Sequence, residues 1–246
     1  SACAGHGPRL ALPPGPAPYT EGLADLRWQG AAAAARTILE DARHAHGLPS
    51  LSVAVHVDGK PTWAAVTGWR DVERREPATL ATRYRLGSTS KAVTATVLAR
   101  LVDRGAMALD TPIGTWCPTL SNKAWPALTP RQLASHTAGI VDYDQNRDLV
   151  GLYHSVTERK QFDSVRQALS VFDGNSLKYE PGADFRYTSF DVVLLSAAME
   201  CASGSPFLDL LDREISVPLG LASLSADHQD RPVPERAVFY WRDAQG

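Results

Sequence analysis

The stretch Tyr84–Val93, with the sequence YRLGSTSKAV, places the hydroxyl of Ser88 and the amine of Lys91 three residues apart at the expected start of a helix. Residues i and i+3 lie on the same face of a helix, so the amine can reach the hydroxyl. A neutral amine in this position takes the serine proton and converts a weak nucleophile into a strong one. The stretch therefore predicts a nucleophilic serine with its base on the first turn of a helix.

Length and composition are those of an ordinary globular protein. The 246 residues are enough for one large domain or two small ones. Hydrophobic residues make up 44% of the chain and charged residues 21%, and the formal net charge is -2. This charge gives no reason to expect nucleic acid or an anionic membrane as partner. No apolar run is long enough to cross a bilayer, so we expect a soluble protein without a transmembrane segment.

The chain contains three cysteines, Cys3, Cys117 and Cys201. An odd number without regular spacing argues against a disulfide framework, and no Cys-x-x-Cys pair suggests a metal site. The N-terminal Ser1-Ala2-Cys3 resembles the end of a bacterial lipoprotein cleavage site. It predicts a protein of the bacterial periplasm or cell envelope, anchored by a lipid on Cys3. The alternative is a free thiol in a flexible N-terminal segment.

The first third of the chain predicts a linker, a helix and a hairpin. Residues 1–20 are rich in proline and show no apolar periodicity, which is typical of a linker. The alanine-rich segment 26–46 has strong helix propensity and is followed by Gly47, a natural stop. Residues 51–57 alternate as a strand does, Asp58-Gly59 favours a tight turn, and residues 62–66 form the returning strand.

Helices dominate the rest of the predicted structure. A short strand is expected at 83–86 and a last one at 237–241, with a helix start at Thr129-Pro130 between them. Further helices are expected at residues 88–104, 158–171, 189–202 and 206–217. This order predicts an α/β (α+β) fold in which a sheet domain carries a helical insertion. We divide the chain into a flexible segment (1–20), the first part of the sheet domain (21–87), a mainly helical domain (88–230) and a return to the sheet domain (231–246).

Four segments together resemble the serine β-lactamase-related hydrolases, in particular the class C β-lactamases and penicillin-binding proteins. They are Tyr84–Lys91, Leu109–Ile113 (LDTPI), Leu133–Ile140 (LASHTAGI) and Glu180–Ser189 (EPGADFRYTS). Their order and spacing match the family from about Leu48 to Leu221. The chain most resembles the branch of the mitochondrial β-lactamase-like protein and its bacterial relatives, which include peptidases and esterases. The resemblance implies an antiparallel sheet with flanking helices and a helical subdomain.

The resemblance also assigns roles to individual residues. It makes Ser88 the nucleophile, Lys91 the amine that accepts or relays its proton, and Tyr187 a second proton-transfer group. Lysine and tyrosine titrate near pH 10 in water, so a base of either type needs a lowered pKa to act at neutral pH. The backbone N–H of Ser88, at the helix N-terminus, would donate to the oxyanion.

Structural alternatives stand beside these roles. Ser88 could instead cap its helix, and Tyr187 could be a core tyrosine with a satisfied hydroxyl. Ser189 is expected either to bind substrate or to cap a helix. His136 suggests a Ser-His pair, but within the family pattern its segment is architectural. His44, His46 and His56 lack a carboxylate or cysteine partner, so we expect no metal and no cofactor.

One hallmark of the family is not found in this sequence. Relatives carry, downstream of the tyrosine, a Lys or His followed by Thr or Ser and then Gly, on a strand that donates the second oxyanion N–H. No segment after Tyr187 matches it. We expect that the C-terminal strands belong to polypeptide outside this chain or to a second chain, which leaves the edge of the 51–66 hairpin without a partner.

The sequence therefore predicts a serine hydrolase that forms an acyl-enzyme through Ser88 on a small-molecule or peptide substrate with an amide or ester bond. Two alternatives remain, a true β-lactamase and a non-catalytic binding protein that keeps the fold.

Overall fold

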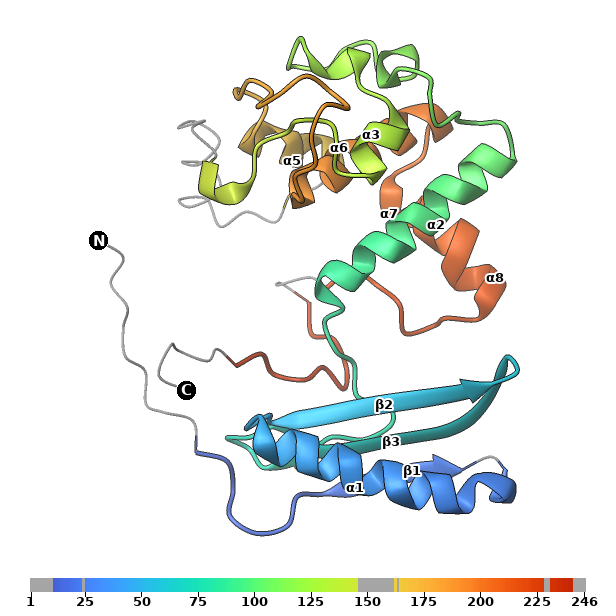
Figure 1. Ribbon diagram of the computed structural model, residues 1–246, viewed down its shortest axis with the longest axis vertical. Coiled ribbons are helices and arrows are strands. Elements are labelled where there is room, and N and C mark those ends of the chain that lie inside the picture. Colours follow the sequence, from blue (N-terminus) through green and yellow to red (C-terminus); the bar gives the residue numbers. More distant parts are fainter. Residues whose placement is uncertain (1–10, 24, 146–161, 163, 228–230, 241–246) are drawn as a thin grey trace. The chain divides into compact units, whose positions relative to one another are not determined.

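A computed structural model describes residues 11–23, 25–145, 162, 164–227 and 231–240 (Figure 1). The chain divides into two compact units. One unit comprises Ser1–Arg85 together with Arg231–Gly246, and the other is Leu86–Asp230. Cys3, with the predicted lipid anchor, lies outside the described residues.

The first unit is built on an antiparallel sheet with the strand order β1-β3-β2. Its strands are β1 (Tyr19–Leu23), β2 (Ser50–Val57), β3 (Lys60–Asp71) and the short β4 (Glu76–Pro77), which pairs with β3. The predicted hairpin is confirmed, and Asp58 and Gly59 have φ values of 50° and 74°, as a tight two-residue turn favours. The strand β3 is longer than predicted because it pairs with β1 on one edge and with β2 on the other.

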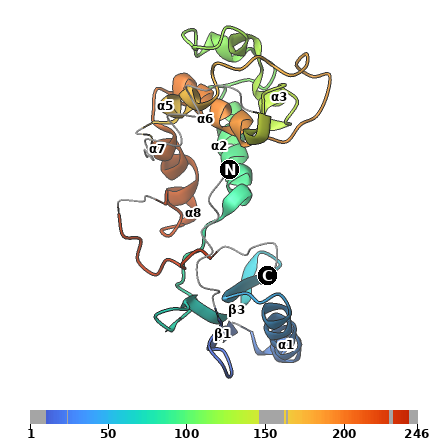
Figure 2. The same cartoon turned by 90° about the vertical axis from the view of Figure 1, so that its left-hand side faces the viewer.

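A long helix covers one face of this sheet. A 3₁₀ turn (Leu26–Trp28) leads into α1 (Gln29–Ala45), which runs along the sheet in Figures 1 and 2. Leu39 of α1 forms a small buried core with Trp63 and Ala65 of β3. The alanines of α1 have small side chains, which lets the helix backbone approach the strands closely.

Three strand predictions needed correction. The strand β1 begins inside the segment 1–20 that was predicted to be a linker, because its backbone is held by β3 and not by a strong local pattern. The predicted strand at 83–86 is a single bridge, in which Arg83 pairs in parallel with Arg236. Residues 237–240 form no regular strand either, although the Val238 N–H donates to the Arg70 carbonyl at 2.7 Å. Trp241 lies outside the described residues.

The second unit is helical and is organised around α6 (Ser189–Ser203). This helix packs against α2 (Ser90–Asp103), α3 (Pro130–Ala134), α5 (Val165–Ala168) and α7 (Phe207–Leu211), and most of its apolar side chains are buried. Shorter 3₁₀ turns connect these helices, at Gly87–Thr89, Ile113–Thr115, Trp125–Ala127, Tyr143–Gln145 and Leu169–Val171. Within the described part of the chain, no helix has the length and apolarity that crossing a membrane requires.

Local signals predicted the ends of two of these helices. Thr129 caps α3 with a complete capping box, in which its side chain accepts from Gln132 N–H and the Gln132 side chain accepts from Thr129 N–H. Gly204 ends α6 in the left-handed conformation.

Two helices differ from the prediction. The described part of the 158–171 segment contains the short α5 and a 3₁₀ turn, not one continuous helix. The 206–217 helix is interrupted, because α7 passes into a π-helical turn (Asp212–Ser216) before α8 (Val217–Leu219). A π turn of this kind inserts a residue into a helix and re-aims the side chains around it.

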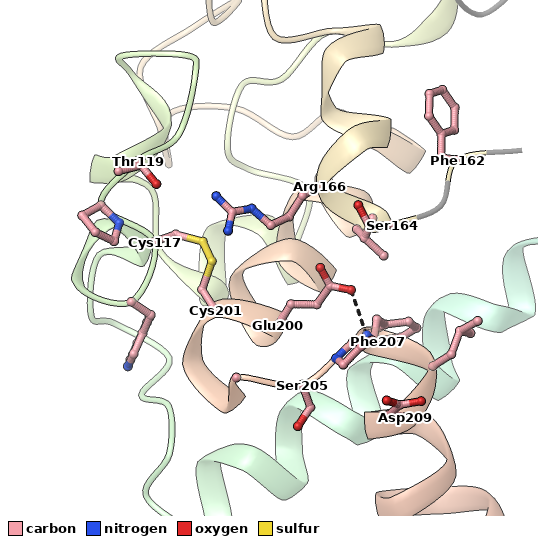
Figure 3. Close-up of a pocket in the computed structure, with 16 residues that line it drawn as sticks. Cys117, Thr119, Phe162, Ser164, Arg166, Glu200, Cys201, Ser205, Phe207 and Asp209 are labelled. Carbon is pink, nitrogen blue, oxygen red and sulfur yellow. Dashed lines mark hydrogen bonds between the residues drawn. A yellow bond between two sulfur atoms is a disulfide. The ribbon is translucent and has the colours of Figure 1, made fainter. Parts of the chain in front are cut away.

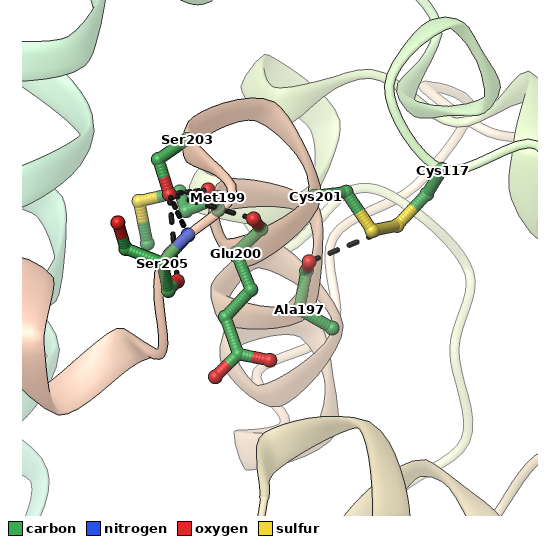
Figure 4. Close-up of a disulfide and its surroundings, with 7 residues drawn as sticks. All are labelled: Cys117, Ala197, Met199, Glu200, Cys201, Ser203 and Ser205. Carbon is green, nitrogen blue, oxygen red and sulfur yellow. Dashed lines mark hydrogen bonds between the residues drawn. A yellow bond between two sulfur atoms is a disulfide. The ribbon is translucent and has the colours of Figure 1, made fainter.

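A disulfide joins Cys117 to Cys201, a bond that the argument against a disulfide framework did not anticipate (Figure 4). The two Cα atoms are 5.5 Å apart in space but 84 residues apart in sequence. Cys117 follows the turn at Ile113–Thr115, whereas Cys201 lies near the end of α6. Sequence spacing carried no signal for this pair, because only the packing of the turn against α6 brings the two side chains together.

The π turn contains a buried carboxylate, Glu214, whose side chain is fully enclosed. Arg104 donates to it at 2.7 Å and Arg213 at 3.1 Å, and Arg100 lies 3.9 Å away. Because Arg100 and Arg104 belong to α2, this carboxylate connects α2 with the segment after α7.

We expect Glu214→Gln to lower the free energy of unfolding by about 2 kcal/mol, because a buried amide nitrogen would then face guanidinium donors. The matched control is Glu76→Gln, which removes a more exposed ion pair with Arg70 and is expected to cost less than about 1 kcal/mol. Urea unfolding of the two variants measures the difference. Equal losses in both variants would contradict the prediction.

Candidate active site

Ser88 lies in a 3₁₀ turn immediately before α2. Gly87 begins this turn with a φ of 54°, a left-handed conformation that suits glycine. The regular helix starts at Ser90, two residues later than predicted, and the cap positions at Leu86 and Thr89 make no side-chain cap. Ser88 is therefore not a helix cap. Its Oγ accepts from Lys91 Nζ at 3.2 Å, so the predicted approach of the amine to the hydroxyl is present.

Tyr187 reaches the same hydroxyl from a distant part of the chain. Its phenol O–H donates to Ser88 Oγ at 2.7 Å, across 99 residues of sequence. The side chain is 46% exposed, so Tyr187 is not a core tyrosine. Lys91 Nζ also lies 4.9 Å from the centre of the Tyr187 ring. Ser88, Lys91 and Tyr187 thus form one hydrogen-bonded cluster.

Ser189 completes the cluster on its other side. Lys91 Nζ donates to Ser189 Oγ at 3.0 Å. The alternative that Ser189 caps α6 is wrong, because Thr188 occupies the cap position and accepts from Phe190 N–H at 3.2 Å. The lysine amine therefore lies between two serine hydroxyls, one in the turn before α2 and one at the start of α6.

The electrostatics of the cluster favour the ionised form of the tyrosine. Hydrogen bonding with Lys91, and then with Ser88, lowers the pKa of Tyr187 below its ordinary value. A lowered tyrosine pKa is what a proton acceptor near neutral pH needs.

His136 has a structural position beside the cluster. Its segment runs alongside residues 178–186, where Arg186 N–H donates to the His136 carbonyl at 2.8 Å and Lys178 N–H donates to the Gly139 carbonyl at 2.7 Å. A Cβ atom on Gly139 would lie 2.6 Å from the Tyr179 carbonyl oxygen, so this close approach requires glycine. These contacts hold the segment that ends at Tyr187.

The His136 ring makes contacts that the sequence did not predict. Nδ1 of His136 lies 3.0 Å from Oδ2 of Asp191, and the ring centre lies 4.7 Å from the centre of the Tyr187 ring. Sequence reasoning missed Asp191, for which the available signal was an acidic residue in the first turn of a predicted helix.

The three histidines considered as metal ligands, His44, His46 and His56, lie in the sheet unit. His44 belongs to the last turn of α1 and His46 follows it, a position where histidines interact favourably with the helix dipole, and His56 is in β2. In the described ranges, no group of three His, Cys, Asp or Glu side chains is arranged to hold a metal ion.

A cavity of about 540 Å³ adjoins the cluster and includes Ser88, Lys91 and Ser189 in its lining. The rest of its wall is mostly apolar. It comes mainly from α5, α6 and α7, through residues such as Val165, Ala168, Val192, Val193 and Phe207, and Gly87 and Ser90 complete it. A larger cavity of about 770 Å³ lies next to the disulfide, between Arg166, Glu200 and Phe207 (Figure 3). The lining of the larger cavity includes none of the four predicted site residues, which are Ser88, Lys91, Tyr187 and Ser189. The smaller cavity is therefore the candidate substrate pocket.

Comparison with known proteins agrees with this geometry. The Beta-lactamase family model matches residues 35–246. The human mitochondrial serine beta-lactamase-like protein LACTB is 26% identical over 265 residues, covering 83% of this chain and 48% of that protein. Esterase EstB of Burkholderia gladioli is 28% identical over 196 residues, covering 76% of this chain and 48% of the esterase.

Among solved structures, the D-amino acid amidase of Ochrobactrum anthropi in complex with D-phenylalanine superposes with a TM-score of 0.70. The two sequences are 25% identical, and the match covers 87% of this chain and 57% of the amidase. The chain spans about half the length of the curated relatives it matches. Fold, site geometry and family model agree, and the chain belongs to the Beta-lactamase family.

Proposed function

We propose that the protein is a serine hydrolase that cleaves amide or ester bonds through an acyl-enzyme on Ser88. The observation that carries this proposal is the position of Ser88 Oγ, which is 3.2 Å from Lys91 Nζ and 2.7 Å from the Tyr187 hydroxyl. A hydroxyl within hydrogen-bond reach of two groups that can take its proton is the arrangement an activated nucleophile needs.

Acylation begins when Ser88 Oγ attacks the substrate carbonyl carbon. The serine proton passes to the Lys91–Tyr187 pair, which must hold one vacant proton position at that moment, as a neutral amine or a phenolate. The carbonyl oxygen becomes an oxyanion, for which we propose the Ser88 backbone N–H as a donor. When the carbon–leaving-group bond breaks, the same pair returns the proton to the leaving nitrogen or oxygen.

Deacylation repeats these steps with water. The Lys91–Tyr187 pair takes a proton from water as its oxygen attacks the acyl carbon, and the proton then returns to Ser88 Oγ. Ser189 Oγ holds the lysine amine between the two helices at 3.0 Å, and we propose that it orients Lys91 or contacts the substrate.

The cavity beside Ser88 supports a substrate with an uncharged, apolar group near the scissile bond. Its wall is formed largely by aliphatic side chains and Phe207, and among the described residues Lys91 is the one charged side chain in the lining. The relatives include an esterase and a D-aminopeptidase, which act on the ester and amide bonds that a serine acyl-enzyme handles. We therefore propose a small ester or a peptide-like amide as substrate.

The test is covalent labelling with a fluorophosphonate and with a fluorescent penicillin, followed by peptide mass mapping. We expect one label on Ser88 and its complete loss in Ser88→Ala. Ser90→Ala is the matched control, because Ser90 lies two residues from Ser88, at the start of α2, but its hydroxyl donates to the Gly87 carbonyl at 2.7 Å. Label that remains in Ser88→Ala would refute the proposal.

Two other outcomes separate the alternatives. Rapid turnover of a chromogenic cephalosporin would favour a true β-lactamase. Reversible penicillin binding without covalent labelling would favour a non-catalytic binding protein of the same fold.

We also propose an oxidising compartment, the bacterial periplasm or cell envelope, which the Cys117–Cys201 disulfide supports. We further propose that strands from other polypeptide, either further sequence or a second chain, pair with the edge of β2. This edge has no partner within the described sheet.

A further inference from the structure

A buried acid–imidazole pair lies beside the proposed catalytic cluster without taking part in it. Nδ1 of His136 and Oδ2 of Asp191 are 3.0 Å apart, and their side chains are 13% and 1% exposed. The other Asp191 oxygen, Oδ1, is buried and has no hydrogen-bond partner among the described residues. The mechanism proposed above leaves this pair without a role, although burying an acid costs free energy.

The pair contacts the site through Tyr187. The centre of the His136 ring lies 4.7 Å from the centre of the Tyr187 ring, and Phe185 meets the imidazole edge-on at 6.2 Å. The backbone provides a second connection, since the N–H of Arg186, the residue before Tyr187, donates to the His136 carbonyl. Asp191 lies in the first turn of α6, two residues after Ser189. The pair is therefore connected to two members of the cluster. His136 contacts Tyr187, and Asp191 lies two residues after Ser189 on the same helix.

The backbone at His136 is strained. Its φ is 58°, in the left-handed region that residues other than glycine seldom adopt, although histidine does so more often than most. Such a conformation persists when surrounding contacts enforce it, and these conformations concentrate at functional sites.

Burial also disfavours the charged form of each member of the pair. Burial, and then the charge of Asp142, raise the pKa of Asp191 to about 8. Burial, and then the charge of Lys91, lower the pKa of His136. An uncharged His136 ring next to Tyr187 adds no second positive charge to that of Lys91.

We propose that the His136–Asp191 pair is a positioning element for Tyr187, which fixes the tyrosine ring so that its hydroxyl stays on Ser88 Oγ. This inference rests on the proposed function. Tyr187 needs such support because its side chain is 46% exposed. Solvent lies on one side of the ring, where no packed side chain among the described residues restricts its movement. A displacement of a reacting group by about 1 Å can cost on the order of a hundredfold in rate. Asp191 acts through His136, and His136 acts through Tyr187.

The test measures the maximal acylation rate and the probe affinity separately, from the concentration dependence of fluorophosphonate labelling. His136→Asn removes the ring, yet asparagine tolerates the left-handed backbone and can still donate to Asp191. Asp191→Ala removes the partner of His136, and Asp191→Asn is the conservative variant that keeps a hydrogen bond to the imidazole. Urea unfolding of each variant checks that it is folded.

We expect His136→Asn and Asp191→Ala each to lower the maximal acylation rate about tenfold or more, with the probe affinity changed less than threefold. Asp191→Asn should restore the rate to within about threefold of the original protein. The decisive measurement is a double-mutant cycle, in which His136→Asn is added to Tyr187→Phe. If His136 acts through the tyrosine hydroxyl, the second change should have almost no further effect.

Full additivity of His136→Asn and Tyr187→Phe would overturn the inference, as would a loss of affinity at an unchanged maximal rate. These outcomes leave the proposed function intact, because Ser88 would still be labelled. Absence of Ser88 labelling in the unaltered protein would instead refute the proposed function itself.

Discussion

Replacing Lys91 by methionine is expected to slow acylation of Ser88 by a factor of about 10³ or more. Residues that activate a nucleophile act as a unit, so removing one of them costs about as much activity as removing all of them. Methionine keeps an unbranched stem of similar shape, so the protein should remain folded. The amine that it removes donates to Ser88 Oγ at 3.2 Å and to Ser189 Oγ at 3.0 Å. Stopped-flow labelling with a fluorophosphonate measures the rate.

The same variant should change the pH dependence of the residual rate. Hydrogen bonding from Lys91 is the main reason why the pKa of Tyr187 is lowered. Without the lysine this pKa rises, so less tyrosine is ionised at any given pH. The rate should therefore begin to increase at a higher pH than in the original protein, which a profile from pH 6 to 10 will show.

Lys91→Arg serves as the control. Arginine keeps a positive charge but stays protonated, so it can stabilise a phenolate and cannot act as a neutral amine. A rate in Lys91→Arg near that of the original protein would indicate a purely electrostatic role for the lysine. Acylation of Lys91→Met at more than about a tenth of the original rate would contradict the proton-transfer role altogether.

Removing the Cys117–Cys201 disulfide is expected to lower the free energy of unfolding by about 4–5 kcal/mol, because it closes a long loop in the unfolded chain. The bond spans 84 residues, and the loop contains Tyr187 and Ser189. The change is the double variant Cys117→Ala with Cys201→Ala, measured by urea unfolding.

Two controls separate the bond from the loss of two sulfur atoms. Cys3→Ala changes the remaining cysteine and should leave the stability as it was. A reducing agent should lower the urea midpoint of the original protein and leave that of the double variant unchanged. A double variant within about 1 kcal/mol of the original protein would show that the bond contributes little beyond its packing.

The sequence determined the features that depend on neighbouring residues. Asp58-Gly59 specified the hairpin turn, Thr129-Pro130 with Gln132 specified the start of α3, and Gly204 specified the end of α6. The approach of Lys91 to Ser88 belongs to the same class, because a spacing of three residues in a helical turn fixes it. Each of these is a local interaction whose partners lie within a few residues of each other.

The family resemblance predicted a contact that local residue patterns could not. The meeting of Tyr187 with Ser88 spans 99 residues and has no local signal, and the recognition of a family segment brought Tyr187 into the predicted site. The same comparison left the role of Ser189 open, since a serine at a helix start caps equally well. The hydroxyl of Thr188, one residue earlier, caps α6 and so removed the capping alternative for Ser189.

Tertiary structure alone decided the remaining features. The strand β1, the Cys117–Cys201 disulfide and the His136–Asp191 pair each join segments that lie about 40 to 85 residues apart, and none carries a periodic pattern. Their partners meet because α6 and β3 pack at the centres of their units and gather distant segments around them. The sequence by itself thus determined the approach of Lys91 to Ser88, and the fold determined what surrounds and holds these two residues, because non-local contacts depend on packing that local residue patterns do not encode.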